Sequence, residues 1–403
     1  MAEIKQRIQA MKHEISDVIS EMQKVATPPI SGMGSPQDID PEDAAQLEDV
    51  GVFTEGAERS GTFVMQDFQS VRALSQVDGL ELLPIQVALE QYDWLRKDYF
   101  FNAVPADLNE STVFVASQAI PQGYFVRVRA GAEITLPCQA ALYISKDHIA
   151  QAVHNVILLE EGASLTMITG CISHYKVPSG VHVAVSETYV GKNATLTSNM
   201  VHSWGEDVIV RPHSGTVVED GGRYISNYIS LRPGANIVSN PQTWLNGKNA
   251  SAKYQTIILG SEGSFIETGG DVYLNGEGSR AELNHRGVCT GGIISQQGLL
   301  HGHNRCRAHV DCAGMLLDGN GDGYIESVPG LEAHHPQAQM SHEASIGRIS
   351  PEQVEYLMAR GLEERDAISM IIRGFLDADI QGLGAELDAR IDAIAQMAGH
   401  GEA

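Results

Sequence analysis

The fold is decided by residues 234–281, which read GANIVSNPQTWLNGKNASAKYQTIILGSEGSFIETGGDVYLNGEGSRA. Within this stretch a glycine or asparagine followed by small residues recurs every 14 or 15 residues, and strand-forming residues follow each recurrence. Glycine and asparagine suit tight corners because they tolerate positive φ. Such a repeat is typical of a β-solenoid, in which each coil of strand, turn and strand stacks on the next coil.

The same turn continues toward the N-terminus at about twice the spacing. Turns begin at Gly131, Gly162, Asn193, Gly234, Asn249, Gly263 and Gly278, at intervals of 31, 31, 41, 15, 14 and 15 residues. Short runs rich in Val, Ile, Thr and Tyr extend from Ser111 to Ile349, which predicts a mainly β protein with a solenoid core. An antiparallel sandwich is the alternative, but its turns should recur at roughly 8–12 residues.

Helical periodicity is expected on both sides of this core. Apolar residues from Ile4 to Val25 alternate in spacings of three and four, which predicts either one half of an intramolecular helix pair or a short dimerising coiled coil. Ser350-Pro351-Glu352-Gln353 is a capping box that begins a C-terminal helix. The predicted regions are an N-terminal amphipathic helix over 1–30, a linker and mixed helical shoulder over 31–110, the β core over 111–349, and a C-terminal helical domain over 350–403.

Composition narrows the range of partners. The chain of 403 residues has 27 Lys+Arg against 51 Asp+Glu, a formal net charge of −24. That charge repels polyphosphate and anionic lipid, so we expect neither nucleic acid nor membrane as a partner. There is no apolar stretch near the roughly 18 residues of a membrane span and no signal-peptide pattern. We therefore expect a soluble, cytoplasmic protein.

Candidate metal ligands gather near the end of the β core. Between His285 and His342 lie seven of the fifteen histidines and three of the five cysteines. Strand alternation would place Cys306 and Cys312 on one face. There is no C-x-x-C pair, so a closed zinc site within one chain is weakly supported, and Cys289 is interpreted as a buried apolar residue. The chain also lacks a phosphate-binding loop, which argues against ATP hydrolysis by this chain itself.

Four segments resemble the SufB/SufD family of scaffold proteins in SUF iron–sulfur cluster assembly. They are Cys312-Ala313-Gly314-Met315-Leu316-Leu317, Gly323-Tyr324-Ile325-Glu326, Ser341 to Ile349 and Glu352 to Leu362. The resemblance continues through Ala367 to Phe375, and the chain length is similar to that of the minimal archaeal-type SufB-like component (SmsB). It implies a right-handed parallel β-helix with helical regions at both ends, which agrees with the solenoid predicted from the turns.

The resemblance also implies residue roles. Cys312, His342 and Glu343 match positions that hold a nascent iron–sulfur cluster, expected to be a four-iron cluster, at a dimer interface, and Cys306 is a further candidate ligand. Cys171 and Trp204 match positions on a sulfur-entry route. The implied partners are a second copy of the chain, apo recipient proteins and a SufC-like ABC ATPase. The residues expected to dock this ATPase are Ile368, Ile371, Ile372 and Phe375.

Two other functions stay open on the sequence. A β-helix metalloenzyme, such as a lyase or isomerase, would use the same histidines and cysteines to hold a single metal ion. A SufD-like structural component would hold no cluster at all. The scaffold interpretation predicts iron together with sulfide, whereas the enzyme predicts one zinc or manganese ion per chain and the structural component predicts that Cys312 is dispensable.

Overall fold

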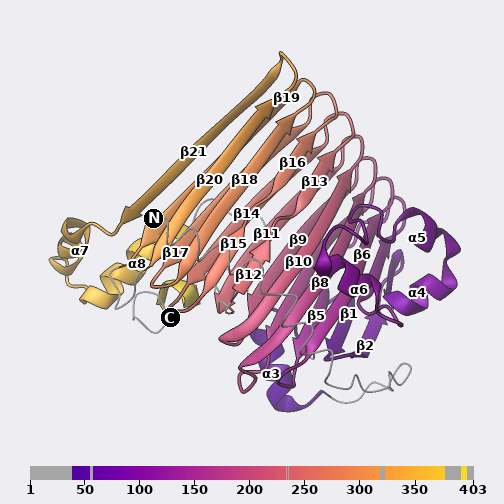
Figure 1. The fold of residues 1–403 in the computed structure, drawn as a ribbon, viewed down its shortest axis with the longest axis horizontal. Coiled ribbons are helices and arrows are strands. Elements are labelled where there is room, and N and C mark those ends of the chain that lie inside the picture. Colours follow the sequence, from indigo (N-terminus) through magenta and orange to yellow (C-terminus); the bar gives the residue numbers. More distant parts are fainter. Residues whose placement is uncertain are drawn as a thin grey trace.

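The computed structural model describes residues 39–54, 58–232, 234, 236–317, 323–376 and 392–396. Its body is a parallel β-solenoid of about seven turns, in which strands of two long sheets alternate along the chain. Figure 1 shows the coils stacked side by side, with helices only at the two ends of the stack. The predicted β-solenoid with flanking helical regions is confirmed. The predicted helix over 1–30 lies outside the described residues.

The first sheet follows the order of the coils. Its strands are β2 (Gln69–Ser75), β1 (Gly61–Gln66), β5 (Cys138–Ile144), β7 (Ser164–Ser173), β9 (Thr195–Ser203), β11 (Arg223–Arg232), β14 (Ser251–Gly260), β17 (Arg280–Cys289), β19 (Cys306–Leu316) and β21 (Ala338–Arg348). All neighbours are parallel except β1 and β2. The last strand, β21, therefore has one edge without a strand partner among the described residues.

The second sheet supplies the opposite wall. Its strands are β3 (Leu80–Pro84), β4 (Tyr124–Val128), β6 (Ala150–Leu159), β8 (Ser179–Val190), β10 (Asp207–Val218), β12 (Asn236–Ser239), β13 (Gln242–Leu245), β15 (Phe265–Thr268), β16 (Asp271–Leu274), β18 (Ile293–Gly302) and β20 (Tyr324–Ala333). Two coils split this strand in two, because β12 with β13, and β15 with β16, occupy the length of one strand of the neighbouring coil. The spacing falls to about 15 for another reason: Gly234 and Gly263 mark the corner from the first sheet to the second, and Asn249 and Gly278 mark the return corner, so both corners of a coil carry the turn.

Six of the seven predicted corners are turns with positive φ. Gly131, Gly162, Gly263 and Gly278 all have φ between +70° and +81°, and Asn193 and Asn249 have φ of +55° and +57°. An L-residue with a large side chain is strained there, whereas Gly and Asn are not. Between the sheets lies a continuous apolar interior built from alternate residues of each strand. The sequence repeat therefore indicates the positions of the corners, and the alternation of apolar and polar residues indicates which side chains face the interior.

A shoulder of strands and short helices closes the N-terminal end. It contains α3 (Pro41–Asp49), α4 (Ile85–Gln91), α5 (Asp93–Asp98) and α6 (Glu110–Ala116) together with β1 to β3, so the region expected to be linker and helix is part strand. Glu187 of β8 is buried and accepts backbone N–H bonds from residues 101–104 at 2.6 to 3.1 Å. It also accepts a bond from the Nε2–H of buried His154 at 2.7 Å. This carboxylate fixes the shoulder to the β-helix.

The C-terminal end carries the tail helices. After β21, α7 (Pro351–Met358) and α8 (Glu364–Leu376) lie beside the end of the first sheet (Figure 1). The predicted helix start at Ser350 is confirmed, with Pro351 as the first helical residue, but the Ser350 side chain makes no cap hydrogen bond, so the predicted capping box is not formed. Residues 392–396 are also helical, and Ile394 belongs to an apolar cluster on the outer face of the first sheet. Among the described residues there is no helix long and apolar enough to cross a membrane.

Candidate functional site

Cys312 lies inside the β-helix near its C-terminal end. On β19 the buried side chains of Cys306, Ala308, Val310 and Cys312 alternate with more exposed ones and join the interior core. The predicted shared face of the two cysteines is therefore confirmed. Six residues of strand nevertheless separate them by about 20 Å. One chain cannot bring Cys306 and Cys312 to the same cluster.

The environment of Cys312 keeps its thiol protonated. Burial, and then the negative charge of Asp311, raise the pKa of Cys312 to about 12. Asp311 itself faces the other side of the strand, where its carboxylate accepts a bond from Arg286 at 2.6 Å. A neutral thiol is a weak nucleophile and a poor ligand, so the free protein holds Cys312 unreactive. A metal ion would have to displace the proton to bind the sulfur.

His285 is the interior neighbour of Cys312 that the sequence did not single out as a ligand. It lies on β17 in register with Cys312, and both side chains are fully buried. Neither ring nitrogen of His285 has a hydrogen-bond partner among the described residues. Burial, and then the positive charge of Arg286, lower its pKa to about 4, so its imidazole is neutral and keeps a free lone pair. An uncharged imidazole beside a buried thiol is a pair of soft to borderline metal ligands.

His342 and Glu343 lie on β21 and point to opposite faces. His342 is in register with Val310 and Glu343 with Asp311, and registered residues of a parallel pair share a face. His342 therefore lies on the interior face, diagonal to Cys312, while Glu343 lies on the outer face. Both are exposed because, in the part of the chain that the structure describes, no later strand covers β21. The structure brings Cys312, His285 and His342 to one face and leaves Glu343 of the same chain off it.

Cys171 and Trp204 lie deeper in the interior, nearer the N-terminal end. Cys171 on β7 is in register with His202, and burial raises the pKa of Cys171 to about 12. The indole of Trp204 is buried between His182 and His202, with ring centroids 5.0 and 5.5 Å away, and its Nε1–H has no partner among the described residues. Burial lowers the pKa of both histidines to about 3. Cys171, His182, His202 and Trp204 therefore form a buried cluster of uncharged side chains.

Polar side chains join the two interior sites through the registered strands. The Tyr228 hydroxyl lies 3.0 Å from Nδ1 of His202. Tyr228 is in register with Thr256, Thr256 with His285, and His285 with Cys312. Five strand spacings of about 4.8 Å put Cys171 and Cys312 roughly 24 Å apart along the β-helix. No sequence pattern indicates the row of Tyr228, Thr256, His285 and Cys312, because its members are 27 to 29 residues apart and of four different types.

The residues expected to dock an ATPase are only partly exposed. On α8, Ile372 is fully buried in the apolar cluster on the outer face of the first sheet, and Ile368 and Phe375 pack against that cluster. Ile371 is half-buried. The exposed apolar side chains of the tail are instead Tyr356, Met358 and Met370, and all three are more than 40% exposed. Part of the expected docking face thus holds the tail on the β-helix.

These features define the class of protein: a parallel β-helix that carries thiols and neutral imidazoles through its interior to an uncovered end. The chain matches the family model "SUF system FeS cluster assembly, SufBD core domain" over residues 142–375. It belongs to the SufBD family of iron–sulfur cluster assembly proteins.

Relatives in archaea support the assignment across most of the chain. A protein of Archaeoglobus fulgidus named as an iron–sulfur cluster assembly SufBD family protein is 38% identical over 357 residues, which cover 88% of this chain and 95% of the relative. One of Methanothermobacter thermautotrophicus with the same name is 39% identical and covers 86% of this chain and 85% of the relative. A SufBD family protein of Pyrococcus horikoshii is 28% identical, covering 79% and 71%. The expected family is confirmed.

Proposed function

We propose that this chain is a non-enzymatic scaffold that holds a nascent iron–sulfur cluster where two copies meet through the C-terminal ends of their β-helices. The observation that carries the proposal is that, among the described residues, no strand pairs with the free edge of β21 in the last coil. Cys312 lies one strand inside it and His285 two strands inside it, and His342 is exposed on the same face of its last strand. A thiolate and imidazoles bind iron, and a mixed ligand set holds a cluster less firmly than four cysteines do.

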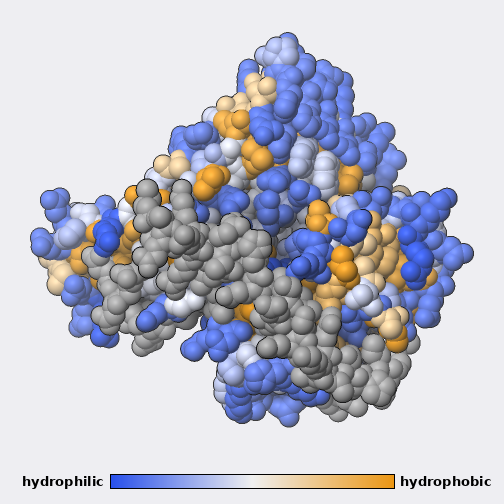
Figure 2. All heavy atoms as spheres, in the orientation of Figure 1, coloured by the Kyte–Doolittle hydropathy of each residue, from blue (hydrophilic) through white to orange (hydrophobic). Residues whose placement is uncertain are grey.

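The edge of β21 supports the pairing of two copies. β21 runs for eleven residues and its free side presents unpaired backbone groups, which natural proteins usually cover or block. Apolar residues lie along this flank of the molecule (Figure 2), and Ile346 of β21 and Val328 of β20 are 45% and 54% exposed. A twofold pairing of the two edges would cover both and bring Cys312 and His342 of both copies to one face. The cluster, expected to be a four-iron cluster, is cargo that apo recipient proteins remove.

Two further parts of the proposal concern the supply of sulfur and of energy. The interior row from Cys171 past Trp204 to Cys312 is proposed to pass sulfur toward the cluster site, because it offers buried thiols and neutral polar groups. Energy is proposed to come from a SufC-like ABC ATPase in the cytoplasm that docks on the tail helices. The exposed Tyr356, Met358 and Met370 offer it an apolar surface.

The ligand assignment is tested by anaerobic reconstitution with ferrous iron and sulfide. Wild-type protein should retain iron and sulfide in equal amounts after desalting, and Cys312→Ser should lose most of both. Cys138→Ser is the matched control, because Cys138 is an equally buried thiol at the other end of the solenoid. Circular dichroism should be the same for all three proteins.

The outcomes separate the alternatives. If Cys312→Ser retains as much iron and sulfide as wild type, the scaffold assignment of Cys312 is wrong and a SufD-like role is favoured. If wild type binds a single zinc or manganese ion without sulfide, the metalloenzyme is favoured. A monomer in light scattering that still holds a full cluster contradicts the two-copy site.

The docking surface is tested with two variants of α8. Met370→Asp changes an exposed residue and should weaken ATPase binding at least tenfold without lowering thermal stability. Ile372→Asp changes a buried residue and should lower stability as well. Normal ATPase affinity in both variants would contradict docking through α8.

A further inference from the structure

A second group of metal-ligand side chains lies on one corner of the last coils. The strand register places Trp244, Tyr273, His301 and Glu332 in one row across β13, β16, β18 and β20. Two residues later along each coil lies a second row, formed by Asn246, Asn275, His303 and His334. Both rows therefore change from aromatic or amide residues to histidine and glutamate as the C-terminal end is reached.

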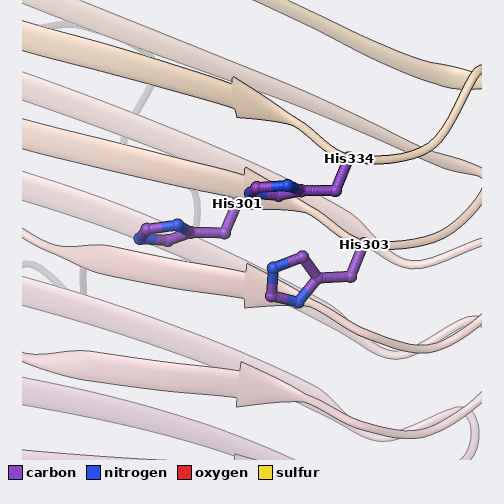
Figure 3. Close-up of side chains that lie close together, drawn as sticks. All are labelled: His301, His303 and His334. Atoms are coloured by element: carbon purple, nitrogen blue, oxygen red, sulfur yellow. The ribbon is translucent and has the colours of Figure 1, made fainter.

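Three histidines of these rows converge. Nitrogen atoms of His301, His303 and His334, one from each ring, all lie within 4.8 Å of one another. Figure 3 shows the three rings side by side where β18 and β20 end. Their backbones come from two successive coils, joined by the bond from the His334 N–H to the Gly302 carbonyl oxygen at 2.9 Å. We propose that these three histidines bind one divalent transition-metal ion.

The hydrogen bonds around the rings orient them as ligands. Nδ1 of His301 lies 2.9 Å from a carboxylate oxygen of Glu332, and Nδ1 of His303 lies 2.8 Å from the amide oxygen of Asn275. Both oxygens are acceptors, so each Nδ1 carries the proton and each Nε2 keeps a lone pair. A carboxylate that orients a metal-bound imidazole is a common feature of metal sites.

Nε2 of His301 is the buried candidate ligand atom, and it makes no hydrogen bond to the described residues. His301 is 9% exposed, and its Nε2 is buried without a hydrogen-bond partner among the described residues. The ring is held in place by Tyr273, which stacks on it with centroids 4.3 Å apart and planes 4° apart. A lone pair left unpaired in a buried site costs free energy. A metal ion at this position would satisfy it.

The geometry fits a small borderline cation after modest adjustment. Metal–nitrogen bonds of about 2.0–2.1 Å place two tetrahedral ligands roughly 3.4 Å apart, which is closer than the present spacing. His303 and His334 are exposed, so a small shift of their rings toward the buried His301 meets little packing. Three imidazoles favour zinc, ferrous iron, cobalt or nickel over magnesium or calcium.

This site is distinct from the proposed cluster site and does not depend on it. Cys312 follows His303 by nine residues, so most of the length of β19 separates them. The metal would join the coil of β18 to the coil of β20 at the uncovered end of the solenoid. Binding should therefore stabilise the last coil, which is the part of the β-helix with the fewest neighbours.

The test is a metal titration of the full-length, metal-stripped protein with cobalt, zinc and ferrous iron under anaerobic conditions. One cobalt ion per chain should give visible d–d bands without a thiolate-to-cobalt charge-transfer band. Zinc should displace it and raise the melting temperature. His303→Ala and His334→Ala should each weaken zinc binding at least tenfold and abolish the rise in melting temperature.

His335→Ala is the matched control, because His335 is the half-buried neighbour of His334 outside the cluster. Its affinity and melting temperature with zinc should match those of wild type. Unchanged zinc affinity in His303→Ala, a thiolate charge-transfer band, or the absence of stoichiometric binding in wild type would each overturn the proposal. Cys312→Ser should bind zinc normally, which keeps this result separate from the scaffold test.

Discussion

Acid should destabilise this protein well above the pH at which its carboxylates titrate. Burial is the main cause that lowers the pKa of His182 and His202 to about 3, and that of His213 and His285 to about 4, from an ordinary value of 6.5. All four are neutral in the folded protein, whereas the unfolded chain protonates them near pH 6.5. The unfolded state therefore binds more protons as pH falls, and stability is lost below about pH 6.5.

The size of the effect follows from the pKa shifts. One pH unit corresponds to about 1.4 kcal/mol for each group, so lowering the pH from about 6.5 to about 5 removes up to ~2 kcal/mol per histidine. His182 and His202 both contact the Trp204 ring, so their contributions are not independent. A total loss of roughly 4–8 kcal/mol is expected, comparable with the whole stability of many domains.

The assay is urea unfolding at about pH 7.5 and about pH 5, followed by the fluorescence of buried Trp204 and by circular dichroism. Wild type should lose most of its resistance to urea at the lower pH. His285→Leu removes one of the four groups and should reduce the loss by up to ~2 kcal/mol. His342→Leu, at an exposed position, should behave as wild type. An identical pH dependence in His285→Leu and wild type would refute the reasoning.

Two further predictions concern how the fold is held. Glu187→Gln should destabilise the protein by about 2–4 kcal/mol, since at least one of the donors of residues 101–104 or His154 loses its charged acceptor. Thermal melting measures the lost stability, and protease nicking measures the loosening of residues 101–104. An unchanged melting temperature would contradict the prediction. Asn249→Val should lower the free energy of unfolding by about 1–2 kcal/mol, because Asn249 has φ of +57° and a β-branched residue is strained there. Asn249→Gly should be nearly neutral. Equal melting temperatures for the two variants would show that the valine is not strained.

The sequence predicted the features that depend on neighbours along the chain. The corners at Gly131, Gly162 and Asn249 could be read because positive φ selects small residues locally. The shared face of Cys306 and Cys312 followed from strand alternation. The start of α7 followed from Pro351, whose fixed φ suits the first position of a helix. Each of these inferences uses only a few consecutive residues.

The interior site could not be predicted in the same way. Cys312 meets His285 because 27 residues of strand, turn and strand return the chain to the same interior row, and each loop changes that number. A slip of one residue in the pairing would turn every side chain of the strand to the other face. The sequence alone therefore grouped His342 with Glu343, whereas the register separates them.

The sequence by itself determined the type of fold, the positions of the corners and the alternation of buried and exposed side chains, because these follow from local backbone preferences. Only the tertiary structure decided which coils bring their side chains together. The register of β19 against β17 and β21 sets the Cys312 row, and the register of β18 against β20 gathers His301 with His334. Register is a property of stacked coils: it comes from the packing of the whole interior and the length of every loop.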